Sequence, residues 1–165
     1  MNLDNGLRIG QSKDTHRLVP GRDLYIGGVK IEHYQGLLGH SDADVLLHAI
    51  IEAIIGAMGK GDIGKHFSDK DDQYKGISSM ILLEKTYEMM ASEGYEIVNV
   101  DSLVVIEKPR MAKYIPLMKE NIARVLHTDI DNINVKATCS EGLGYIGEEK
   151  GADAHAVVLI RKCFK

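Results

Sequence analysis

The sequence predicts an α/β fold, specifically an α+β two-layer sandwich in which helices lie on one face of a mixed β-sheet. Two observations lead to this prediction. Segments of strand-like alternation interleave along the chain with segments of helical period, and each predicted helix has one strongly apolar face. The 165 residues contain no internal repeat, low-complexity tract or Pro/Ser-rich linker, so we expect a single domain over residues 1–165.

The N-terminal half begins with extended segments at residues 7–10 and 23–31, the second of which follows a turn signal at Pro20-Gly21. A helix is then expected over about residues 42–58. Ser41 can cap this helix, and Asp44 three residues later completes a capping-box pattern. Glycines end the helix between residues 59 and 64, and residues 67–76 are predicted to form a polar loop.

The C-terminal half alternates helices with strands. An amphipathic helix is expected over residues 77–94, ending at Gly94, and a long strand over residues 95–107. A third helix spans about residues 111–127 and is either bent or started at Pro116. Two more strands are expected at residues 132–138 and 154–162.

Composition excludes several classes of protein. A net charge of −4 argues against a general nucleic-acid binder, although a small anionic substrate could still bind through local positive charge or a metal. Two cysteines, Cys139 and Cys163, cannot form a disulfide framework and favour a reducing compartment. The N-terminal ten residues lack the features of a signal or transit peptide, and no apolar run reaches membrane-spanning length. We therefore expect a cytoplasmic protein with no membrane partner.

Three residues form a candidate metal site. Asp14 and His16 are two apart, so in an extended segment both side chains leave the same face. His48 lies in an otherwise apolar helix with Glu52 four residues later, on the same side. Asp14, His16 and His48 together are a trio competent to bind zinc, with Glu52 as a carboxylate that orients the imidazole. The alternatives are surface residues at 14 and 16, and a core histidine bonded to Glu52.

Two further patterns are ambiguous. Gly59, Gly61 and Gly64 match G-x-G-x-x-G, but they follow a helix rather than a strand, which excludes a dinucleotide fingerprint. These glycines would let the backbone approach a ligand, with Asp62 available to sugar hydroxyls. Residues 138–141 end a predicted strand in hydroxyl, thiol and carboxylate groups that could bind phosphate and a divalent cation. The alternative is an ordinary strand end that leads into a Gly-rich turn.

Six motifs in this order closely resemble the 2-C-methyl-D-erythritol 2,4-cyclodiphosphate synthases of the non-mevalonate isoprenoid pathway. They are "DTHRL", "IGGVKI", "GLLGHSDADVLLHAI", "GDIGKHF", "NVDSLVVIEKPRM" and "NVKATCSEGLGYIG". The resemblance runs from about Arg8 to Leu159, and the block "HSDADVLLHA" is highly specific.

The resemblance implies a homotrimeric phosphorus–oxygen lyase with active sites between subunits. Its substrate, 4-diphosphocytidyl-2-C-methyl-D-erythritol 2-phosphate, would attack its own β-phosphorus through the 2-phosphate and expel CMP. Asp14, His16 and His48 would hold zinc, and Glu141 would assist a second cation, Mg²⁺ or Mn²⁺. His40 would contact the substrate phosphates and help to stabilise the transition state, and Cys139 would occupy the second catalytic position.

The resemblance also implies which residues contact substrate. Residues 62–64 and 67–69 would meet it, residues 106–112 would form the cytosine pocket, and Thr138 would contact the diphosphate. The complete expected set is Asp14, His16, His40, Ser41, Asp62, Ile63, Gly64, Phe67, Ser68, Asp69, Ile106, Pro109, Arg110, Met111, Ala112, Thr138, Cys139, Ser140, Glu141 and Tyr145.

Three departures separate this chain from the pattern of the family. The lead-in "GQSKDTH" lacks the usual aromatic residue, Cys139 replaces the usual Thr, and Glu148 replaces an Arg associated with anion binding near the trimer axis. Two rival functions stay open. One is a zinc-dependent phosphohydrolase in which water attacks, and the other is a relative that keeps the fold and metal but only binds nucleotides.

Overall fold

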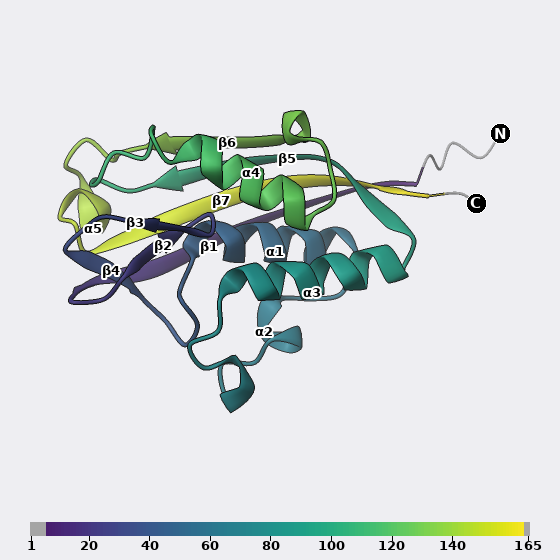
Figure 1. Cartoon of the computed structure of the whole chain (residues 1–165), viewed down its shortest axis with the longest axis horizontal. Helices are drawn as coiled ribbons and strands as arrows, with labels where there is room; N and C mark the ends of the chain where they lie inside the picture. Colours follow the sequence, from purple (N-terminus) through teal and green to yellow (C-terminus); the bar gives the residue numbers. More distant parts are fainter. Residues whose placement is uncertain (1–5, 164–165) are drawn as a thin grey trace.

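The computed structural model describes residues 6–163. The expectation about targeting peptides concerned the first ten residues, of which residues 1–5 lie outside the described range. The main sheet has the strand order β4-β1-β7-β5-β6, and a separate two-stranded sheet pairs β2 with β3 (Figure 1). In chain order the elements are β1 Leu7–Pro20, β2 Leu24–Ile26, β3 Val29–Ile31, β4 Gln35–Leu38, α1 Val45–Ala57, α2 Ile63–His66, η1 Asp72–Tyr74, α3 Ser79–Ser92, β5 Tyr95–Val105, α4 Ile115–Val125, η2 Ile130–Asn132, β6 Ile133–Thr138, α5 Gly144–Gly147 and β7 Gly151–Lys162.

The main sheet is mixed, because β5 and β6 are parallel whereas the other neighbouring strands are antiparallel. The helices α1, α3 and α4 gather on one face (Figure 1). The predicted two-layer architecture is therefore confirmed. The other face of β1 and β7 is left uncovered and carries exposed apolar side chains, with Ile9 70% and Val157 43% exposed.

Strand β1 is far longer than the predicted segment at residues 7–10, and it pairs with β7 from Leu7 to Arg17. From Gly10 to His16, the helix-facing residues are Gly10, Ser12, Asp14 and His16, so the apolar alternation that marks a strand is missing over this stretch. Gly10 permits close contact with α1. A Cβ atom added there would lie 1.8 Å from the carbonyl oxygen of Ala53.

Residues 23–31 are a hairpin rather than one extended segment. Gly27 and Gly28 form the turn between β2 and β3, with φ angles of 62° and 71°. Both values lie in the left-handed region that two-residue hairpin turns require and that glycine adopts without strain. Asp44 accepts hydrogen bonds from the amides of Gly27 and Gly28 and thereby fixes the hairpin against the start of α1.

The predicted start of α1 at residue 42, with Ser41 as its cap, is wrong. Ala43 has a φ of 57°, which interrupts any helix before Val45. Asp44 is the N-cap instead, and its carboxylate accepts a hydrogen bond from the Leu47 amide at 3.0 Å. Helix α1 lies at the centre of the molecule, and ten of its residues are buried.

The other predicted helices and strands are present, whereas β4, η2 and α5 were not predicted. Pro116 lies in the first turn of α4, so it starts this helix and does not bend it. The predicted loop at residues 67–76 contains the short helix η1, and the unpredicted helix α2 precedes it; both protrude below α1 and α3 in Figure 1. Within residues 6–163, no helix is both long and apolar enough to cross a bilayer.

Candidate metal centre and active site

The predicted metal trio converges on one point. Asp14 and His16 leave the same face of β1, and His48 reaches them from α1. Asp14 Oδ2 lies 2.9 Å from His16 Nε2 and 3.2 Å from His48 Nδ1, and the two ring nitrogens are 3.2 Å apart. The predicted convergence is confirmed, and these three residues form a group that could hold a metal ion.

The outer nitrogen of each imidazole has a partner elsewhere. His16 Nδ1 lies 2.9 Å from the carbonyl oxygen of Leu38, which can only accept, so this nitrogen carries the proton. His48 Nε2 lies 2.9 Å from Ser79 Oγ and 3.2 Å from Ser41 Oγ. In the neutral imidazole of His16, the inner nitrogen Nε2 therefore directs its lone pair toward the carboxylate of Asp14.

A cation fits this arrangement. Asp14 Oδ2 is buried and accepts no hydrogen bond of normal geometry, although two imidazole nitrogens lie beside it. Three electron-pair donors of the kind that bind zinc thus face one another, and three protein ligands leave a coordination position open for substrate.

The pKa shifts of Asp14 and His16 also indicate that positive charge is favoured at this site. Burial by itself would raise the pKa of Asp14, but the neighbouring His16 and His48 outweigh it and hold this pKa well below its usual range. Burial likewise opposes protonation of His16, but the carboxylate of Asp14 outweighs it and raises the pKa of His16.

The expected contact between His48 and Glu52 is not made, so both readings of that pair are wrong. Glu52 Oε2 accepts a hydrogen bond from Ser12 Oγ at 2.7 Å, and its Oε1 accepts one from the Ile63 amide at 3.3 Å. The spacing of four residues puts both side chains on one side of α1, but β1 and the start of α2 provide closer partners for the carboxylate.

A cavity of about 450 Å³ surrounds the metal trio. His40 lies at this cavity, and its Nε2 is 3.1 Å from the carbonyl oxygen of Asp71. The lining residues that were expected to contact substrate are Asp14, His16, His40, Ser41, Ile63, Gly64, Phe67 and Asp69.

Asp62 and Ser68 do not line this cavity. Asp62 caps α2 by accepting a hydrogen bond from the Lys65 amide, and Ser68 Oγ accepts one from the Lys70 amide. Both side chains thus stabilise local turns of the segment that covers the cavity.

A second cavity of about 490 Å³ lies at the β5–β6 edge of the sheet. It is lined by Ile106, Glu107, Lys108, Pro109, Arg110, Met111, Ala112, Ile115, Ala137, Thr138 and Cys139. This set contains every residue expected in the cytosine pocket, together with Thr138 and Cys139.

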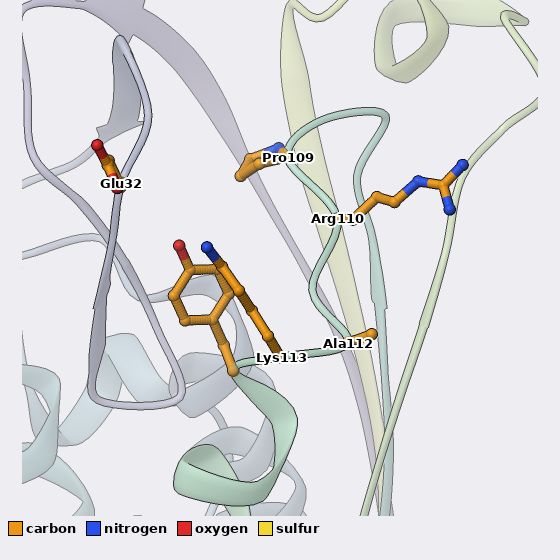
Figure 2. Close-up of a pocket in the computed structure, with 6 residues that line it drawn as sticks. Glu32, Pro109, Arg110, Ala112 and Lys113 are labelled. Carbon is orange, nitrogen blue, oxygen red and sulfur yellow. The ribbon is translucent and has the colours of Figure 1, made fainter.

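A third recess lies on the other side of the loop at residues 109–114, facing Glu32 (Figure 2). Lys113 Nζ lies 4.9 Å from the ring centroid of Tyr114 in this recess. Arg110 extends away from Glu32 and Lys113 (Figure 2), and Arg110, Pro109 and Ala112 line both this recess and the cavity at the β5–β6 edge.

The loop after β6 is fixed by Glu107, a residue of the expected cytosine pocket whose structural role the sequence reasoning missed. Its carboxylate accepts hydrogen bonds from the amides of Ser140 and Gly142, at 3.1 Å and 3.2 Å. The sequence signal for this role was the position of Glu107 directly after β5, because β5 and its parallel neighbour β6 end side by side. Within the loop, Cys139 Sγ lies 3.4 Å from Glu141 Oε1, and Ser140 Oγ donates to the Leu143 carbonyl.

Tyr145 lines neither of the two large cavities. Its hydroxyl donates to the carboxylate of Asp153 at 2.6 Å, and Asp153 also accepts from Lys13 Nζ at 2.9 Å and Thr15 Oγ1 at 2.8 Å. Tyr145 thus belongs to a polar cluster on the uncovered face of the sheet.

The two large cavities lie at the same end of the sheet but do not meet within one chain. Thr15, Asp153, Val105 and Thr138 occupy one cross-strand row. Because partners in a row point to the same face, Thr138 points to the uncovered face, whereas His16 points to the face that α1 covers. Three strand spacings of about 4.8 Å also separate β1 from β6 by about 14 Å.

Comparison with known proteins agrees with this geometry. The model of the YgbB family matches residues 7–161. The 2-C-methyl-D-erythritol 2,4-cyclodiphosphate synthase of Clostridioides difficile is 54% identical over 154 residues, which are 93% of this chain and 96% of that protein.

Two solved structures share the fold at substantial identity. The structure of IspF from Plasmodium falciparum in complex with CDP has a TM-score of 0.85 and 34% identity, and the match covers 97% of this chain and 99% of that one. The bifunctional IspDF from Campylobacter jejuni has a TM-score of 0.91 and 38% identity, over 95% of this chain and 42% of that one. The chain therefore belongs to the YgbB family.

Proposed function

We propose that the chain is a 2-C-methyl-D-erythritol 2,4-cyclodiphosphate synthase of the non-mevalonate isoprenoid pathway. It converts 4-diphosphocytidyl-2-C-methyl-D-erythritol 2-phosphate to 2-C-methyl-D-erythritol 2,4-cyclodiphosphate and releases CMP, which makes it a phosphorus–oxygen lyase. The observation that carries this proposal is the convergence of Asp14, His16 and His48 in a cavity that His40 and Ser41 also line. The family membership of the chain supports it.

The reaction suits a site without an activated nucleophile. An oxygen of the 2-phosphate attacks the β-phosphorus, a new P–O bond forms, and the bond to the α-phosphate oxygen breaks so that CMP leaves with the electron pair. A phosphate dianion needs no general base, so the protein has to position the reacting groups and neutralise charge. His40 and Ser41 line the metal cavity, which supports their proposed contact with phosphate oxygens.

The metal we assign to the trio is zinc, because two imidazoles and one carboxylate match its ligand preference. When bound, it would supply positive charge beside the phosphate oxygens. Glu141 is an exposed carboxylate in the loop after β6, and we assign it to a second cation, Mg²⁺ or Mn²⁺, on the diphosphate. Cys139 and Thr138 would contact the same diphosphate from the neighbouring cavity.

The cavity at residues 106–112 takes the cytosine. Its loop carries Pro109, Met111 and Ala112, which give it apolar walls for a planar base. Asp62 and Ser68 would reach substrate from their local turns, and Tyr145 from the cluster around Asp153.

A complete active site requires a second copy of the chain, and we propose a homotrimer. The metal cavity opens on the helix-covered side of the sheet, whereas Thr138 points to the uncovered face. The exposed Ile9 and Val157 on that face are suitable for burial between copies. Each copy comprises a single domain. The free thiols of Cys139 and Cys163 are compatible with the reducing cytoplasm, where we place the reaction.

The activity test separates this function from its two rivals. The zinc-loaded protein is incubated with the cytidyl substrate and Mg²⁺, and the products are followed by phosphorus NMR. A synthase yields CMP and the cyclic diphosphate together. A phosphohydrolase would yield CMP with the acyclic 2,4-bisphosphate, and a nucleotide-binding relative would yield neither, so either outcome would refute the proposal.

Assembly is tested by complementation. Ala112→Trp fills the proposed cytosine pocket at an exposed position, and His48→Ala removes a metal ligand. Each variant alone should be inactive. Mixed and re-formed trimers contain some sites with both halves intact, so activity should return in part. Light scattering that gives a fully active monomer would refute the shared site.

A further inference from the structure

Ser79 is a fully buried hydroxyl that the proposed reaction does not use. It lies in the first turn of α3 with no exposed surface. The preceding Ser78 already caps this helix, because its Oγ accepts a hydrogen bond from the Met80 amide. The hydroxyl of Ser79 is therefore free of a capping role and makes two contacts at the metal centre.

These contacts connect His48 to the carboxylate of Asp42, which is not part of the metal trio. Ser79 Oγ lies 2.9 Å from His48 Nε2 and donates to Asp42 Oδ1. Asp42 is held in place because its Oδ2 accepts from the Ser79 amide at 3.0 Å and its Oδ1 from the Asp44 amide at 3.2 Å.

The donor and acceptor of each hydrogen bond between Asp42, Ser79 and His48 follow from the protons that each group can carry. An ionised carboxylate only accepts, so the single proton of the Ser79 hydroxyl goes to Asp42. Toward His48 the same oxygen must then accept, and Nε2 must carry the proton. The lone pair of His48 is thereby left on Nδ1, which faces Asp14 and His16.

We propose that Ser79 and Asp42 are positioning residues for the metal ligand His48. Together they fix its ring orientation and tautomer so that Nδ1 is available to zinc. The proposal rests on the proposed zinc role of His48. It gives the metal centre a support from α3, an element that contributes no ligand to the trio. Such hydrogen-bonded supports typically change metal affinity by roughly 10- to 100-fold when they are removed.

The experiment measures zinc affinity by competition with a chromophoric chelator. Ser79→Ala should lower the affinity by roughly 10- to 100-fold. Ser79→Thr, which keeps the hydroxyl, should restore most of it. Ser78→Ala is the matched control, because it removes the neighbouring hydroxyl and the helix cap without touching His48. We expect its zinc affinity to stay within about twofold of the wild-type value.

Two further measurements separate positioning from folding. Urea unfolding of the zinc-free variants reports any loss of stability independently of zinc. In the zinc-loaded protein labelled with ¹⁵N-histidine, the Nε2–H proton of His48 should be protected from exchange with water. Ser79→Ala should accelerate this exchange, and Ser78→Ala should leave it unchanged. The protection in the wild type tests the inference even if Ser79→Ala does not fold.

The outcomes distinguish the inference from the function beneath it. Retention of wild-type zinc affinity by His48→Ala would overturn the metal assignment itself. Loss of zinc in His48→Ala together with unchanged affinity in Ser79→Ala would overturn only the positioning role. Equal losses in Ser78→Ala and Ser79→Ala would also overturn it, because they would trace the effect to the start of α3 in general. A rapidly exchanging Nε2 proton in the wild type would do the same.

Discussion

Gly10→Ala tests how closely the strand that carries two metal ligands packs against the helix that carries the third. The new Cβ would lie 1.8 Å from the carbonyl oxygen of Ala53 and 2.7 Å from the amide nitrogen of Ala57. Real Cβ contacts essentially never fall below 3.0 Å, so strand and helix have to separate by about 1.2 Å. Both contacted atoms belong to the backbone of α1, so no side-chain rotation relieves the clash.

The expected loss of stability follows from this geometry. Overpacking a core typically costs about 1–3 kcal/mol. A clash with the backbone of a central helix should reach the upper end, so we expect about 3 kcal/mol. Gly56→Ala is the control, because it lies on the same helix with no atom within 4 Å of the new Cβ. It should stabilise the protein by about 0.5–1 kcal/mol, since alanine restricts the unfolded chain.

The assay is urea unfolding followed by circular dichroism, with chelator present and one protein concentration throughout, so that metal binding and association do not differ between samples. Zinc affinity is measured in parallel. Separation of β1 from α1 should move His48 away from Asp14 and His16, so Gly10→Ala should also bind zinc more weakly than Gly56→Ala. A variant Gly10→Ala with the unfolding midpoint and zinc affinity of the wild type would refute this account of the packing.

Three further predictions concern single side chains. Cys139→Thr should raise turnover at unchanged zinc content, because a hydroxyl donates more strongly to phosphate than a thiol does; steady-state CMP release measures this, and a slower variant would contradict it. His48→Ala should reduce zinc from about one ion per chain to little or none while the helix still folds; full zinc content by elemental analysis would contradict it. Burial opposes ionisation of Asp153, but hydrogen bonds from Lys13, Tyr145 and a neighbouring threonine outweigh it and lower its pKa. The ionised form therefore stabilises the fold above the ordinary aspartate pKa of about 3.9, and this stabilisation is lost as the pH falls through the lower folded-state value. Asp153→Asn should cost about 1–3 kcal/mol at neutral pH, and its difference from the wild type in urea unfolding should shrink in acid; a difference that does not vary with pH would refute this.

Local patterns in the sequence predicted the fold class because the buried helices and the central strands carry regular apolar periodicity. The length of β1 escaped prediction for a physical reason. Its uncovered face bears mixed side chains, and its covered face bears Gly10, Ser12, Asp14 and His16, which pack closely or bind rather than fill a core. Successive residues of β1 therefore do not alternate between apolar and polar. The strand pattern is thus interrupted by the same face of β1 that supplies the metal ligands Asp14 and His16.

The hairpin at residues 24–31 could have been predicted more sharply. Two consecutive glycines between short apolar segments are a recognised signal for a two-residue turn, and the positive φ angles of Gly27 and Gly28 explain why glycine is needed there. The partner of Glu52 could not have been predicted in the same way. Helical spacing places it beside His48, but its actual partners Ser12 and Ile63 come from distant segments that only the tertiary fold brings close.

The crowding of polar residues at the start of α1 has an explanation that neither capping nor metal binding supplies alone. Asp44 caps the helix and also holds the hairpin turn at Gly27 and Gly28. Asp42, two residues earlier, binds Ser79 at the start of α3. Each carboxylate thus fastens a different segment to the helix that carries His48. The sequence alone does not show whether Asp42 or Asp44 caps α1. The role of each carboxylate depends on which distant segment the tertiary fold brings within its reach.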